Sequence, residues 1–137
     1  MGDSELSHYE VDASRVSPQR TRVDTGDAEF VVGKDVNPVE YFLGSVLGCL
    51  NSTGTMVARD MDIDIESLEA TVEGDVNYAT YLGKESEDRT GLQGLEVSLS
   101  VETAGEADLE AWLAAVKERC PVTDNVENET SVAVSLE

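Results

Sequence analysis

The sequence contains few of the side chains from which metal sites and histidine-assisted catalytic sites are built. Its 137 residues include two cysteines, Cys49 and Cys120, and one histidine, His8. The cysteines are 71 residues apart, so the close CxxC spacing of zinc and redox motifs is absent. A single histidine near the start does not complete a zinc site and is a poor base for either cysteine. We therefore expect neither a bound metal nor a cofactor.

Long apolar runs are also missing. No stretch approaches the ~20 apolar residues that a membrane-spanning helix needs. The first seven residues, MGDSELS, have neither the basic nor the apolar region of a signal peptide. These features predict a cytoplasmic protein with no membrane partner. In that reducing compartment, a permanent structural disulfide is not expected.

Positive charge is scarce. Lysine and arginine total 9 against 29 aspartates and glutamates, which gives a net charge of −20. Without a basic patch, binding to nucleic acid is disfavoured. The acidic residues are spread along the whole chain, as if the entire surface were adapted to its solvent. Molar salt shortens the screening length to about 3 Å and relieves such self-repulsion. This pattern favours a protein from a salt-accumulating halophile, and an acidic mesophilic protein is the alternative.

The patterns of apolar residues, turns and caps predict an α+β fold with antiparallel sheet, in a single domain that covers residues 1–137. Three short strands are expected to form a meander, followed by a long helix, two strands, a second helix and a last strand. The predicted strands are residues 8–16, 20–24, 28–32, 68–76, 95–101 and 131–136, and the predicted helices are 38–59 and 109–119.

The start of the first helix carries strong capping signals. Asn37 suits the N-cap, Pro38 suits the first helical position, and Glu40 completes a capping-box spacing. Asp108 suits the N-cap of the second helix. Three glycines inside the first helix cost up to about 1 kcal/mol each relative to alanine. They suggest that another backbone, most simply the second helix, approaches closely; they are Gly44, Gly48 and Gly54.

Both cysteines fall on the apolar stripes of their helices. Cys49 shares its stripe with Phe42, Val46, Thr53, Met56 and Val57, and Cys120 continues the stripe of Leu109, Trp112, Leu113 and Val116. If the helices cross there, the two sulfurs can approach bonding distance, which is a demanding condition. The alternative is that both cysteines are simply small buried apolar residues.

Two motifs contain the cysteines, NPVEYFLGSVLGCL over residues 37–50 and ERCPV over residues 118–122. They resemble the first-cysteine helix and the second-cysteine signature, respectively, of the OsmC/Ohr family of osmotically induced and organic hydroperoxide resistance proteins. The resemblance implies an intertwined homodimer that reduces organic hydroperoxides. Cys49 would attack the peroxide and become a sulfenic acid, and Cys120 would close a disulfide with it. A dithiol reductant, either a lipoyl protein or a thioredoxin-like protein, would restore both thiols.

The resemblance also implies an arginine, held by a glutamate, that activates the first cysteine. Arg20 is the first candidate, with Arg22, Arg15 and Arg89 as rivals. Glu40 is the candidate acid, although it also suits a purely capping role. The chain lacks the family's G-R-x-G turn and has Val39 where the Ohr branch has an acid. These departures leave open a catalytically weak stress-response protein or a small-ligand-binding protein of the same fold.

Overall fold

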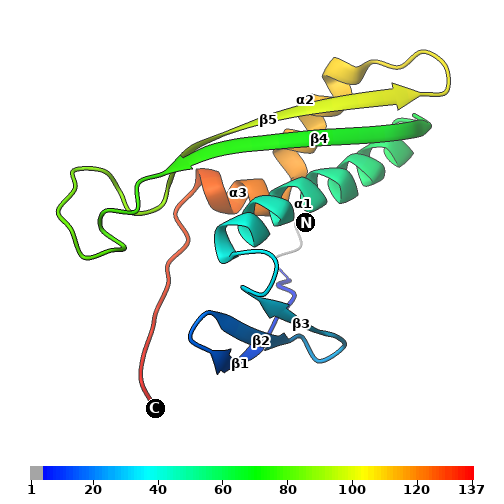
Figure 1. The fold of residues 1–137 in the computed structure, drawn as a ribbon. Coiled ribbons are helices and arrows are strands. Elements are labelled where there is room, and N and C mark those ends of the chain that lie inside the picture. Colours follow the sequence, from blue (N-terminus) through cyan, green and yellow to red (C-terminus); the bar gives the residue numbers. More distant parts are fainter. Residues whose placement is uncertain (1–4) are drawn as a thin grey trace. The chain divides into compact units, whose positions relative to one another are not determined.

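The computed structural model describes residues 5–137, and the fold is α+β with antiparallel sheets. The chain divides into two compact units, one that ends at Phe42 and one that covers Leu43–Glu137. We call them unit 1 and unit 2 (Figure 1). Among the described residues, none of the helices has the length and apolar composition of a membrane span. That the two units make one domain stays a prediction.

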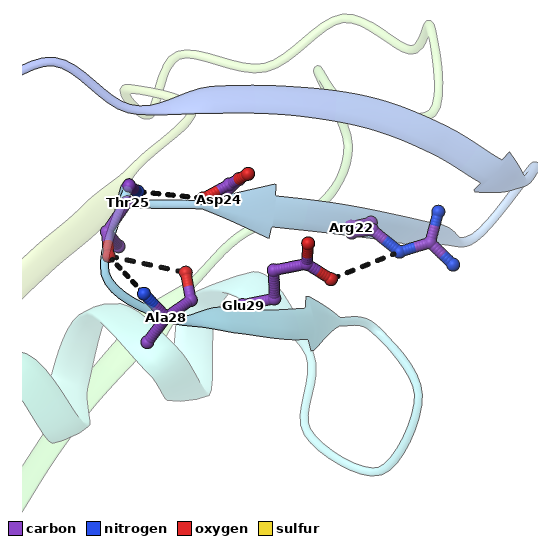
Figure 2. Close-up of polar contacts among 6 residues, drawn as sticks. Arg22, Asp24, Thr25, Ala28 and Glu29 are labelled. Carbon is purple, nitrogen blue, oxygen red and sulfur yellow. Dashed lines mark hydrogen bonds and ion pairs between the residues drawn. The ribbon is translucent and has the colours of Figure 1, made fainter.

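Unit 1 holds the predicted three-stranded meander. Strands β1 (Asp12–Ser17), β2 (Arg20–Asp24) and β3 (Glu29–Val32) pair antiparallel in the order β1-β2-β3. Asp24, Thr25 and Ala28 close the turn between β2 and β3 by local hydrogen bonds (Figure 2). None of residues 5–42 is buried. So small a sheet is not expected to be stable without a surface to pack against.

Helix α1 (Pro38–Asp60) begins where its capping signals predict. The Asn37 side chain accepts a hydrogen bond from the Glu40 backbone N–H at 2.9 Å, and the Glu40 carboxylate accepts one from the Asn37 N–H at 3.0 Å. Pro38 occupies the first helical position. The predicted capping box is therefore confirmed, because each residue satisfies a backbone donor that the helix leaves unpaired.

Unit 2 packs helices against a two-stranded sheet. Strands β4 (Ile65–Val76) and β5 (Leu92–Thr103) pair antiparallel along most of their length. Helices α2 (Leu109–Arg119) and α3 (Pro121–Glu127) follow them (Figure 1). Asp108 caps α2 as predicted, by accepting from the Ala111 N–H at 3.1 Å. The buried core consists of Val46, Leu50, Val57 and Ala58 from α1 with Trp112, Val116 and Cys120.

One of the three helix glycines explains how α1 and α2 approach. A Cβ on Gly54 would lie 2.6 Å from Cζ2 of Trp112, closer than real carbon contacts allow. The Trp112 indole N–H also donates to the Gly54 carbonyl at 2.9 Å. The second helix therefore does pack against Gly54 as predicted, but the atoms that approach belong to the Trp112 side chain and not to a backbone. The predicted close approach is wrong for Gly44 and Gly48 within residues 5–137, where an added Cβ would meet nothing within 4 Å.

Three further expectations need correction. Residues 131–136 form no strand, although their apolar residues alternate, because the described chain gives them no strand to pair with. Helix α3 was not predicted, since Pro121 marks the end of one helix and equally the first position of the next. The apolar stripes were also partly wrong, because the side chains of Phe42, Met56 and Leu113 are exposed.

Candidate active site

The two cysteine sulfurs meet within unit 2. Cys49 Sγ and Cys120 Sγ lie 3.0 Å apart, although the residues are 71 positions apart in the chain. Both cysteines are free thiols. The separation is about 1 Å longer than the ~2.05 Å bond of a disulfide, so a small side-chain adjustment would close one. The arrangement is therefore a reduced thiol pair at close range.

The helices hold this pair in place from several sides. Cys49 lies on α1 and packs against the core, while Cys120 is itself a core residue and only 2% exposed. The Trp112–Gly54 contact fixes where α2 crosses α1. An ion pair between Arg119 and Asp60, at 2.9 Å, joins the last turns of the same helices. Cys120, directly after Arg119, is thereby set against α1.

Cys120 occupies the junction between α2 and α3. It is the C-cap of α2 and the residue before the first turn of α3, with an extended backbone at φ −82° and ψ 111°. Its carbonyl accepts from the Thr123 hydroxyl at 3.2 Å and from the Asp124 N–H at 3.1 Å. The expectation that Cys120 continues the stripe of α2 is corrected in one respect: the side chain joins the core, but the residue has left the helix.

The environment of Cys120 favours its thiolate. Burial raises the pKa of the Cys120 thiol, because it penalises the charged form. Hydrogen bonds to the sulfur from Thr123, Cys49 and the Val122 backbone together outweigh burial, so the pKa lies below its usual value. Of the two thiols, the less accessible one is thus stabilised as an anion by groups at the start of α3.

Cys49 is the more accessible of the two thiols, because it is only partly buried. Besides Cys120, its sulfur contacts the Thr53 hydroxyl at 3.7 Å, where either atom can donate. Thr53 lies one helical turn further along α1 and is buried. Of the two side chains, that of Cys49 is therefore the one that solvent reaches more readily.

The candidate arginines are divided between the two units. Arg20 is exposed at the start of β2 in unit 1, and Arg22, two residues further on, lies on the same face of that strand. Arg22 pairs with Glu29 at 3.8 Å (Figure 2). Arg15 pairs across the sheet with Thr21 and so lies on the opposite face from Arg20. Activation of Cys49 by Arg20 stays a prediction.

Arg89 is the one candidate arginine that belongs to the same unit as the cysteines. Its guanidinium donates to the Leu92 carbonyl at 2.8 Å and so stabilises the turn that leads into β5. That contact gives Arg89 a local structural role. Glu40, in unit 1, is engaged in the capping box, and whether it also holds an arginine stays a prediction.

The described residues contain no metal cluster, and the cleft that the structure describes lies away from the cysteines. Within residues 5–137, no group of three or more histidine, cysteine, aspartate or glutamate side chains could hold a metal ion. A cleft of about 600 Å³ in unit 2 lies between α1 and the sheet, and the cysteines are not part of its lining. Its lining consists of Leu43, Val72, Glu73, Gly74, Asp75, Gln93, Gly94, Leu95 and Glu96.

Comparison with known proteins agrees with the motifs and the fold. The OsmC-like protein family matches residues 31–135, and the chain belongs to this family. Among solved structures, an OsmC-like protein from Mycoplasma pneumoniae has a TM-score of 0.77 at 15% identity, and the match covers 90% of this chain and 89% of that one. No curated protein is significantly similar to the chain.

Two further structures carry names that refer to peroxides. An organic hydroperoxide resistance protein from Legionella pneumophila is 23% identical with a TM-score of 0.61, and the match covers 90% of this chain and 91% of that one. An organic hydroperoxide resistance protein from Elizabethkingia anophelis is 18% identical with a TM-score of 0.63, and the match covers 93% of both chains. At these identities the likeness shows the fold.

The sequence indicated both cysteines but missed the groups that surround them. Thr53 is four residues after Cys49 and was noted only as part of an apolar stripe, although i, i+4 spacing on a helix predicts the contact. Thr123 was missed because α3 was not predicted, and with it the hydrogen bonds that surround Cys120.

Proposed function

We propose that this protein reduces organic hydroperoxides with the thiol pair of Cys49 and Cys120. The observation that supports this most strongly is the 3.0 Å separation of the two sulfurs across 71 residues of sequence. Buried cysteines that serve only as small apolar residues have no need to meet. Membership of the OsmC-like family, with structural relatives named organic hydroperoxide resistance proteins, supports organic hydroperoxides as the proposed substrate class.

In the proposed reaction, the Cys49 thiolate attacks the distal oxygen of R–OOH. A sulfur–oxygen bond forms, the O–O bond breaks, and the alkoxide takes a proton to leave as R–OH. The Cys120 thiolate then attacks the sulfur of the Cys49 sulfenic acid. A disulfide forms, and the hydroxide that is released takes a proton to become water. Two electrons pass from the thiols to the peroxide.

The roles follow from accessibility and charge. Cys49 is partly exposed and can meet a substrate, whereas Cys120 is buried and has a lowered pKa. A ready thiolate at Cys120 suits the second step, where it attacks the sulfenic acid. The same property suits regeneration, because a thiol of lower pKa is the better leaving group when an external dithiol attacks Cys49.

Arg20 is proposed to stabilise the Cys49 thiolate, with Glu40 to orient it. Positive charge is required because apolar surroundings oppose ionisation of a thiol. Apolar side chains from β4, β5 and α2 pack against the core beside Cys49. A charge from unit 1, or from a second copy, would supply the stabilisation.

A homodimer is proposed as the active form. The described part of the meander in unit 1 has no buried residue, and residues 131–137 form no helix or strand, with Val132, Val134 and Leu136 highly exposed. An added Cβ on Gly44 or Gly48, beside Cys49 on α1, would meet nothing within residues 5–137. A second copy would cover these surfaces.

Sedimentation equilibrium tests the homodimer. It should give twice the chain mass for the wild type, and the double variant Val132→Ser with Val134→Ser should form a weaker dimer. A monomeric wild type would refute the proposed dimer.

The electron donor is proposed to be a lipoyl protein or a thioredoxin-like protein in the cytoplasm. The alternative of a small-ligand-binding protein has one observation in its favour, the cleft beside α1 and the sheet, which the peroxidase chemistry does not use. A ligand in that cleft would leave both thiols unchanged, so the two functions are separable.

A steady-state assay tests the proposal. Wild type, Cys49→Ser and Cys120→Ser are compared for reduction of cumene hydroperoxide and hydrogen peroxide, with dihydrolipoamide or a thioredoxin as the donor. We expect turnover only in the wild type, with the organic peroxide preferred. Cys120→Ser should stop after one event, with a sulfenic acid at Cys49. If the Cys49→Ser variant forms a sulfenic acid at Cys120 and the Cys120→Ser variant does not react with peroxide, the roles of the two cysteines are reversed. Equal activity in all three proteins would refute the proposal.

A further inference from the structure

Thr53 is an exception in the core of unit 2. Among the described residues it is the one buried residue that is polar, at 8% exposure, and its neighbours in the core are apolar. A hydroxyl in such surroundings is costly unless it has a hydrogen-bond partner. The position would suit valine, which has the same shape. A retained hydroxyl at this place calls for a specific partner.

The partner is the sulfur of Cys49. The Thr53 hydroxyl lies 3.7 Å from Cys49 Sγ, one helical turn away on the same face of α1. A threonine in a helix often donates instead to the carbonyl four residues back, and Thr55 does so, to Asn51 at 2.9 Å. The contrast within one helix indicates that Thr53 is directed to the sulfur.

We propose that Thr53 is a further catalytic residue, whose hydroxyl donates a hydrogen bond to the Cys49 sulfur as that sulfur becomes the attacking thiolate. This inference rests on the proposed reduction of hydroperoxides. A hydroxyl both accepts and donates, so it accepts from the Cys49 thiol and turns to donate once the proton has left. A donor to the charged form favours that form. The hydroxyl keeps its own proton throughout.

Few other groups compete for this role. The titratable side chain in contact with Cys49 is Cys120, at 3.0 Å. Apolar side chains of β4, β5, α2 and α3 pack against this core, among them Leu68, Leu99 and Val122. Among the described residues, the Cys49 sulfur thus has two hydrogen-bond partners, Cys120 at 3.0 Å and Thr53 at 3.7 Å, and Thr53 is the one that the proposed reaction does not consume.

The test uses a Cys120→Ser background, in which oxidation stops at the Cys49 sulfenic acid and Cys49 titrates alone. Four variants are compared in it: Thr53→Val and Thr53→Ala, which lack the hydroxyl; Thr53→Ser, which keeps it; and Thr55→Val, a matched change at an exposed site of the same helix. Two quantities are measured. One is the rate constant of sulfenic acid formation with cumene hydroperoxide, and the other is the pH dependence of Cys49 alkylation by iodoacetamide.

We expect Thr53→Val to slow sulfenic acid formation about tenfold at neutral pH and to move half-maximal alkylation to higher pH by up to about one unit. Thr53→Ser should restore both, and Thr55→Val should match the background. An unchanged rate and alkylation profile in Thr53→Val and Thr53→Ala would overturn the inference. So would a Thr53→Ser variant as slow as Thr53→Val, since shape alone would then explain the effect. If the background itself does not react with peroxide, the proposed function fails, and the alkylation profile still tests the hydrogen bond.

Discussion

Replacing Gly54 with alanine should separate the two helices that bring the cysteines together. The added Cβ would lie 2.6 Å from Cζ2 of Trp112, whereas ordinary contacts begin at 3.4 Å. The ring must therefore withdraw by about 0.8 Å, which would also stretch the 2.9 Å hydrogen bond from the indole N–H to the Gly54 carbonyl. The neighbour is a buried ring held by the core, so it cannot turn aside as a flexible surface side chain would.

The magnitude follows from three contributions. Overpacking in a core costs about 1–3 kcal/mol. Loss of the indole hydrogen bond costs about 1 kcal/mol. Alanine in place of glycine inside a helix offsets part of this loss, because its higher helix propensity stabilises the helix by up to about 1 kcal/mol. We expect Gly54→Ala to lower the free energy of unfolding by about 1–3 kcal/mol, measured by urea denaturation of the reduced protein and followed by circular dichroism.

A double-mutant cycle with Trp112→Phe supplies the control. Phenylalanine lacks the Cζ2 atom that would clash, so Gly54→Ala should be neutral or slightly stabilising in that background. A coupling energy of about 1 kcal/mol or more is expected, because the two residues are in contact. Equal effects of Gly54→Ala in both backgrounds would show that the helix crossing does not depend on this contact.

Three further predictions concern charge and ionisation. Glu40→Gln should leave the stability of α1 unchanged, because glutamine also completes a capping box. A large loss of peroxidase activity at unchanged stability would show that the Glu40 carboxylate is catalytic as well as a cap. Unchanged activity would leave capping as its role. Thr123→Val should raise the pKa of the Cys120 thiol, seen as alkylation that requires higher pH. A thiol pKa that is lower in the folded than in the unfolded state stabilises the protein fully above the unfolded value of about 8.5, and this stabilisation is lost as pH falls through the folded value. Thr123→Val should therefore lower the free energy of unfolding more at high pH than at pH 6. An equal loss at both pH values would contradict the prediction. Finally, the net charge is −20, and the described part of the chain contains two ion pairs. Because salt screens repulsion between the acidic side chains, the melting temperature should rise by more than about 5 °C between 0.1 and 2 M KCl. A melting temperature that does not change with salt would exclude adaptation to salt.

The parts of the fold that could be predicted from the sequence are those whose determinants are local. The starts of α1 and α2 were predicted to the residue, because Asn37 and Asp108 cap them through neighbours three residues away. The meander and the two long strands followed from alternation and turn residues. The positions of both cysteines on apolar helix faces predicted that the two sulfurs could meet if the helices cross there. In the structure the sulfurs lie 3.0 Å apart.

The rest depends on contacts that the sequence pattern does not specify. Which face of α1 is buried is set by Trp112 against Gly54, so a stripe drawn from apolar residues alone wrongly included Met56. The alternating segment 131–136 satisfies a strand pattern, but a strand needs a partner, and the described chain does not provide one. The groups around Cys120 come from α3, whose start coincides with a proline that equally marks an end.

A catalytic thiol pair is tested most directly by a count of thiols before and after fully reduced protein receives one equivalent of cumene hydroperoxide. Two thiols per chain should be lost. Mass spectrometry should then find Cys49 joined to Cys120, and a non-reducing gel should show a single-chain band. Two unchanged thiols, or a disulfide that joins separate chains, would contradict a catalytic pair within one chain.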